Sequence, residues 1–194
     1  MLLAASCSRL LAPDVEREFR QLRTGNYRLD INHTAVIFKI QHLGLSTYVG
    51  RFNDVEAWLN FDPNDTASIT LDAQVPVASL DVNNAELKET LLTGTWFDAE
   101  RFPDIAFTST GVSPWKQDNQ WQLAGDLTLH GTVRPVTWYS TFHGGADNLL
   151  TGKYTLGFSA TTSIKRSDFG MDSYLGMVGD EIQIEVYAEF QKVK

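Results

Sequence analysis

Histidine is the side chain in this 194-residue sequence that most readily binds metals or moves protons, and the chain has four. An imidazole can ligate a metal or haem iron, or it can satisfy backbone groups at the end of a strand. His33 and His42 lie nine residues apart, a spacing that matches no familiar metal motif. We therefore favour the structural role and predict no metal site. His130 and His143 each precede a glycine, so we expect a turn residue and an exposed residue respectively.

Nucleophilic catalysis would need a serine, a histidine and a carboxylate held together, and Asp30, His42 and Ser46 supply these residue types. The chain has no Gly-x-Ser-x-Gly nucleophile elbow and no glycine-rich phosphate loop after a strand. Most carboxylates alternate outward along expected strands, which is typical of a solvated face. We predict that the protein is not an enzyme and requires no cofactor.

Cys7 is the single cysteine, and it ends the stretch MLLAASC. Small residues between leucines and a cysteine resemble the end of a bacterial lipoprotein signal, after which the cysteine is lipidated and anchors the protein to the envelope membrane. The alternative is an ordinary thiol, because the stretch lacks a basic start and its apolar part is short. A start further upstream would supply both features. We expect a periplasmic protein, since a chain with no second cysteine fits an exported domain that relies on its core.

Charge and length exclude several other classes of protein. The net charge is −8 and no cluster of Lys or Arg offsets it, so nucleic acid is not an expected partner and an anionic membrane surface is disfavoured. No apolar run approaches the ~20 residues that span a bilayer. With 43% apolar residues the chain suits one globular domain.

Period-2 alternation of apolar and polar residues dominates the chain from residue 26 onward, as in Ile182, Ile184, Val186, Ala188 and Phe190. One wet face per strand is typical of antiparallel sheets, and so many half-buried strands must close or stack to hide their edges. We predict an all-β, antiparallel barrel of about eight strands. The expected strands lie near residues 27–31, 36–40, 54–61, 68–75, 104–111, 121–130, 133–142, 154–161 and 181–190, with residues 144–148 as a polar connection.

Helical signals occur in two places. Residues 83–92 carry an asparagine cap and apolar positions 87, 91 and 92, and Gly94 follows, which predicts one short helix inserted among the strands. Pro13-Asp14 could cap a second short helix from Val15 to Arg23. We divide the chain into a signal remnant and tether, residues 1–25, and a folded domain, residues 26–194.

Six segments, in order, resemble the YceI-like family of periplasmic lipid-binding proteins. They are YRLDINHT at residues 27–34, FKIQHLGLS at 38–46 with GRF at 50–52, SLD at 79–81, WFDAERFP at 96–103, GDLTLHGTVRPV at 125–136 and RSDFGM at 166–171. The resemblance implies an extended, lipocalin-like barrel around an elongated apolar pocket that holds a polyisoprenoid or an isoprenoid quinone. It also implies links to membrane cytochromes or stress responses in some relatives, and it leaves residues 1–25 unexplained.

The ligand contacts that we expect follow from the inward faces and from two of the matched segments. In the loop after residue 165, Phe169 and Met171 could line or gate the barrel mouth, or Arg166 could lock the loop by pairing with a carboxylate such as Asp168; both roles stay open. The predicted ligand-binding residues are Phe38, Ile40, His42, Leu43, Phe61, Phe107, Trp121, Phe158, Phe169 and Met171.

A non-enzymatic carrier or store for a long-chain isoprenoid lipid is the function that we predict. A haem- or metal-linked redox accessory protein is the alternative, because of the histidines, and a barrel simply filled with side chains is a third hypothesis. Pairing of two copies into a homodimer stays open.

Overall fold

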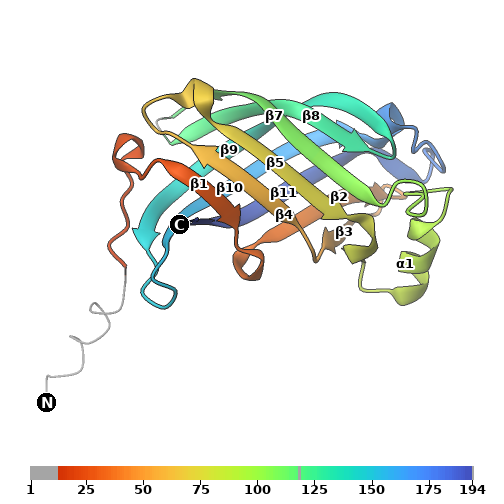
Figure 1. Ribbon diagram of the computed structural model, residues 1–194. Helices are drawn as coiled ribbons and strands as arrows, with labels where there is room; N and C mark the ends of the chain where they lie inside the picture. Colours follow the sequence, from red (N-terminus) through yellow and green to blue (C-terminus); the bar gives the residue numbers. More distant parts are fainter. Residues whose placement is uncertain (1–12, 118, 194) are drawn as a thin grey trace, which may run out of the picture.

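A computed structural model of the protein describes residues 13–117 and 119–193. An antiparallel barrel makes up most of this part of the chain, with the N-terminal segment at one end and helix α1 at the other (Figure 1). Eight strands close the barrel in the order β1, β4, β5, β7, β8, β9, β10, β11 and back to β1. Their bounds are Gly25–Leu29, Glu56–Phe61, Thr70–Pro76, Asp104–Pro114, Gln120–Leu129, Thr132–Asp147, Tyr154–Lys165 and Val178–Lys192.

Closure depends on β1, which pairs with β4 on one side and with β11 on the other. Beyond β1 the one-turn 3₁₀ helix η3 (Ile31–His33) interrupts the chain, and β2 (Ala35–His42) then continues along β11. The sheet continues from β2 to β3 (Ser46–Phe52) and the two-residue β6 (Leu80–Asp81). Because closure pairs both edges of the ring, it removes the exposed edges that an open sheet would carry.

Alternation along the strands places apolar side chains inside and polar side chains outside. In β4, Ala57, Leu59 and Phe61 are buried while the residues between them are exposed. The same parity orients β11, where Ile182 through Phe190 present every second side chain to the interior. The prediction of an all-β barrel of about eight strands with one inserted helix is confirmed.

Two glycines let phenylalanine rings lie flat against the inside of the barrel. A Cβ atom on Gly50 would lie 2.2 Å from Cζ of Phe38, its partner on the adjacent strand. A Cβ atom on Gly125 would lie 2.3 Å from Cζ of Phe107. The missing side chains therefore create the space that the rings occupy, which is a common reason for glycine inside a strand.

Helix α1 spans Ala85–Leu92, as the asparagine and the apolar spacing predict. The side chain of Asn84 accepts a hydrogen bond from the backbone N–H of Leu87 at 2.9 Å. The apolar side of α1 packs on a cluster formed by Phe52, Leu80 and Val82. None of the helices within the two described ranges has the length and apolar character to cross a bilayer.

Two local predictions are wrong. The helix expected at Val15–Arg23 is a single 3₁₀ turn, η2 (Phe19–Gln21), because Glu16 makes backbone hydrogen bonds in both directions with Gly145 instead of within a helix. The connection expected at residues 144–148 is sheet as far as Asp147, where β9 still pairs with β10. Tertiary pairing thus overrides the local capping and turn signals.

Candidate functional site: the barrel interior

The interior of the barrel contains an apolar cavity of about 270 Å³. Side chains from the eight barrel strands and from β2 and β3 line it, and all but Thr34 and Ser140 are apolar or aromatic. Engineered cavities of ~150 Å³ with such walls stay dry and bind apolar guests. A larger cavity of the same chemistry therefore favours a hydrocarbon ligand over water.

Half of the predicted contact residues line this cavity: Phe38, Phe61, Phe107, Trp121 and Phe158. They come from β2, β4, β7, β8 and β10. What they share is that each occupies a position of its strand whose side chain faces the interior. Whether they bind a ligand stays a prediction.

The other predicted contact residues do not line the cavity. His42 is exposed at the end of β2, and Leu43 lies in the adjoining turn with φ +53° and half of its surface exposed. Ile40 pairs with Ile182 but lies outside the lining. The matched segment at residues 38–46 thus faces the cavity at Phe38 and leaves the barrel wall at its end, where His42 and Leu43 lie.

Phe169 and Met171 are almost fully buried, at 1% and 4% exposure. They lie in and just after η6 (Arg166–Phe169) and pack against Leu127, Leu129 and Ile164 as part of the core. The loop is therefore a structural plug, with no face left for the cavity in this arrangement.

Arg166 fastens this plug through backbone carbonyl groups rather than through Asp168, which is exposed. Its guanidinium donates to the carbonyls of Gly179, Met171 and Val178 at 2.8, 2.6 and 2.9 Å. Burial lowers the pKa of Arg166, although nearby carboxylates, mainly that of Asp180, oppose the shift. The expected pairing with Asp168 is wrong because main-chain oxygens from two segments already satisfy the buried guanidinium.

Several cavity residues were not predicted from the sequence. Phe19 belongs to the segment expected to be a tether, Phe97 to a loop after α1, and Trp138 to a strand whose inward face was not assigned. Trp138 could have been found from the register, because it pairs with the inward Leu123. No local pattern marks Phe19 or Phe97.

Two tryptophans in the cavity wall lie on the neighbouring strands β8 and β9. Trp121 on β8 pairs with Ser140 on β9, and Trp138 lies two residues before Ser140 in β9. The indole N–H groups of Trp121 and Trp138 are buried, and neither donates to an acceptor within the described part of the chain. A buried donor without a partner costs about 1–3 kcal/mol, and because both nitrogens are inaccessible, neither N–H group is presented to a ligand in the cavity.

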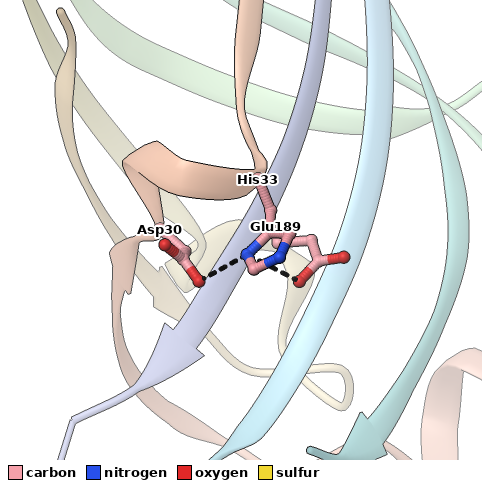
Figure 2. A group of neighbouring side chains, drawn as sticks. All are labelled: Asp30, His33 and Glu189. Carbon is pink, nitrogen blue, oxygen red and sulfur yellow. Dashed lines mark hydrogen bonds and ion pairs between the residues drawn. The ribbon is translucent and has the colours of Figure 1, made fainter.

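Outside the barrel, His33 bridges two carboxylates where η3 meets β11 (Figure 2). Its Nδ1 lies 2.9 Å from Oδ2 of Asp30 and 4.0 Å from Oε2 of Glu189. The hydrogen bond with Asp30 raises the pKa of His33. Partial burial opposes ionisation of Asp30, but its hydrogen bonds, first that with His33, outweigh burial and lower the pKa of the carboxyl group.

The three ligand atoms of Asp30, His33 and Glu189 lie close enough to hold a cation. However, Asp30 already accepts hydrogen bonds from the backbone N–H of Asn32 and from the side chain of Gln191. The contacts among Asp30, His33, Glu189 and Gln191 therefore hold the η3 turn between β1 and β2 against β11. His33 was expected to satisfy backbone groups, and it binds carboxylates instead.

The remaining histidines and the serine follow simpler patterns. His130 adopts φ +51° in the turn before Gly131 and His143 is exposed, as predicted. Ser46 pairs with His42, whereas Asp30 lies beyond the opposite end of β2 and is bonded to His33. The structure does not bring the three triad residue types together.

A closed antiparallel barrel around an apolar cavity defines a lipocalin-like architecture. Residues 27–190 match the model of the YceI-like domain, and the chain belongs to this family. A UPF0312 protein of Pseudomonas fluorescens is 36% identical over 180 residues, which cover 90% of this chain and 89% of the relative.

Solved structures share the fold. BcnA of Burkholderia cenocepacia superposes with a TM-score of 0.75 at 25% identity, covering 83% of this chain and 98% of BcnA. A polyisoprenoid binding domain from Saccharophagus degradans superposes with a TM-score of 0.68 at 9% identity, covering 88% of this chain and all of that domain.

Proposed function

We propose that the protein binds a long apolar lipid of the polyisoprenoid class inside the barrel and serves as a carrier or store rather than an enzyme. The observation that carries this proposal is the cavity of about 270 Å³ with an almost wholly apolar wall. The likeness to a polyisoprenoid binding domain supports the choice of lipid.

The physical basis is burial of hydrocarbon. Each methylene moved from water into the cavity gains about 0.8 kcal/mol, and ordering the flexible chain and losing translational freedom cancel part of this gain. Affinity should therefore increase with chain length until the cavity is full, with little dependence on head group.

An isoprenoid quinone belongs to this class because its tail is a polyisoprenoid. The wall of the cavity offers almost no accessible polar group to a head group. A quinone and a hydrocarbon of the same length should therefore bind with similar affinity, which titration calorimetry with both would measure.

We place the protein in the periplasm, with lipidation of Cys7 as its membrane anchor; Cys7 lies outside the described residues. An anchored barrel would exchange lipid with the adjacent membrane. Mass spectrometry of the mature N-terminus would identify a diacylglyceryl group if this proposal is right.

The direct test is solvent extraction of the purified protein followed by mass spectrometry. A matched pair of variants makes it specific to the interior. Ala160 lines the cavity, and Thr161 beside it faces outward. Ala160→Trp should lower the bound lipid several-fold because the indole fills the cavity, and Thr161→Trp should leave it unchanged. Wild-type protein that repeatedly carries no lipid and binds no long-chain quinone would disprove the proposal.

A further inference from the structure

Phe19 enters the interior of the barrel from a segment that precedes the first strand. It is one of the residues that line the cavity. Its ring stacks on Trp121 with centroids 4.4 Å apart and meets the edges of Phe61 and Phe142 at 5.3 and 5.9 Å. Three aromatic side chains from β4, β8 and β9 thus surround a fourth that no barrel strand supplies.

Backbone pairing holds this segment against β9. Glu16 and Gly145 exchange two backbone hydrogen bonds, each 2.8 Å long. Two adjacent glycines make the approach possible: a Cβ atom on Gly144 would lie 2.4 Å from the side chain of Val15. On Gly145 it would lie 2.9 Å from Cδ2 of Leu22 in this segment and 2.4 Å from the hydroxyl oxygen of Tyr154 in β10.

Side chains on both sides of Phe19 add to this attachment. Leu22 is buried in the largest core cluster with 4% of its surface exposed. Arg23 donates two hydrogen bonds to the carboxylate of Asp147, both 2.7 Å long, and its guanidinium lies over the ring of Tyr154. The backbone carbonyl of Arg23 accepts a hydrogen bond from the hydroxyl of Tyr27. Residues 16–23 are therefore a fixed part of the barrel end.

The segment crosses the end of the barrel opposite α1 (Figure 1). At the α1 end the cavity is lined by Phe52, which belongs to the cluster beneath the helix, and by Phe97, which packs against that cluster. Phe19 lines the cavity from the opposite end, where the tip of an inserted hydrocarbon would stop.

We infer that residues 16–23 form the end wall of the lipid cavity and that Phe19, the residue of this segment that lines the cavity, sets the length of the chain that fits. The inference rests on the proposed lipid function and adds a residue that determines specificity. This segment precedes the part of the chain that matches the YceI-like domain model, which begins at residue 27.

Binding of polyprenols that lengthen by one isoprene unit at a time, from farnesol through geranylgeraniol up to solanesol, tests the inference. Wild-type affinity should rise along the series and level off where the chain reaches Phe19. A phenyl ring occupies about the space of one isoprene unit, so Phe19→Ala should move the plateau about one unit further. Affinity for chains beyond the wild-type limit should rise about tenfold. Phe19→Trp should move the plateau toward shorter chains.

Arg20→Ala is the control, because Arg20 is exposed in the same 3₁₀ turn. Circular dichroism would verify that each variant is folded, and Phe19→Leu supplies a milder truncation if the alanine variant is not. Equal plateaus in wild type, Phe19→Leu and Phe19→Trp would overturn the inference while leaving the lipid function intact. A wild type that binds no member of the series would overturn both.

Discussion

The two ends of the barrel are closed by different kinds of interaction. At the end near α1, the plug around η6 is fixed by the buried guanidinium of Arg166 and its three bonds to carbonyl groups. At the other end, aromatic faces and edges around Phe19 meet without a polar lock inside the cavity.

This difference separates a closure held by buried polar bonds from one whose inward-facing ring makes only aromatic contacts. A buried guanidinium cannot leave its acceptors without leaving several polar groups unsatisfied, so the plug is either formed or unfolded. Aromatic pairs also have preferred geometries, but each contributes only about 0.5–1.5 kcal/mol beyond burial, so replacing one ring costs less than unpairing a buried guanidinium. We therefore expect substitutions in the plug to change mainly the free energy of unfolding, and substitutions at Phe19 to change mainly which ligands bind.

The largest effect is expected from Arg166→Met, which leaves the carbonyls of Met171, Val178 and Gly179 without their donors. We expect the free energy of unfolding to fall by about 4 kcal/mol, measured by urea denaturation. Lys165→Met is the matched control, because the neighbouring lysine is exposed and should change stability by less than ~0.5 kcal/mol. Equal effects of the two variants would remove the distinction between the ends.

Phe169→Ala should cost about 3 kcal/mol, because the ring is 1% exposed and its loss leaves a hole in the core. Since Phe169 does not line the cavity, the chain-length preference measured with the polyprenol series should not change. A preference for longer chains in this variant would show that the plug also bounds the ligand.

A smaller effect is expected from Arg23→Gln at the other end. The pair that Arg23 forms with Asp147 is exposed, so the melting temperature should fall by a few degrees at most. Hydrogen exchange should report the change more clearly, because the amides of Glu16 and Gly145 are hydrogen-bonded between the same two segments that Arg23 and Asp147 join. Unaltered protection of both amides would mean that Leu22 and the backbone bonds suffice to hold the segment.

The smallest effect concerns His33, which lies on the outside of the barrel between the two ends. Because its pKa is raised, the stabilisation it gives is complete below about pH 6.5, the ordinary histidine pKa, and is lost as pH rises through the higher folded value. The lowered pKa of Asp30 makes its contribution complete above about pH 4 and lost in stronger acid.

His33→Gln should therefore reduce the free energy of unfolding most between about pH 4 and 6.5, by less than ~1 kcal/mol because the imidazole is more than half exposed. Urea denaturation near pH 5.5 and 8.5 would measure the difference. His143→Gln is the control, since its imidazole faces the neutral hydroxyl of Ser159. A His33 effect of the same size at both pH values would contradict the ion pair.

The barrel could be predicted from the sequence because side-chain parity is a local property. In a strand such as β4 or β11, the alternation of apolar and polar residues indicates which side chains face inward. Closure of the sheet into a barrel is then expected, because it pairs the edge strands that would otherwise be exposed. The cavity aromatics Phe61, Phe107 and Trp121 were found in this way. The attachment of Arg166 was not, because every residue type has a backbone carbonyl, so the carbonyls of Met171, Val178 and Gly179 leave no mark in the sequence.

The N-terminal end wall shows a second limit of sequence reasoning. Val15–Arg23 carries helix signals of its own, and only the pairing between Glu16 and the paired glycines of β9 overrides them. Residues more than a hundred positions apart decide that conformation, so neither segment predicts it alone.

A crystal structure of the protein purified with its native lipid, or loaded with a long-chain quinone, would show directly whether the barrel holds lipid. We expect elongated ligand density inside the barrel, in contact with Phe107 and Phe158 and ending at Phe19. An interior closed by repacked side chains, with the lipid on the outer surface or absent, would contradict this expectation.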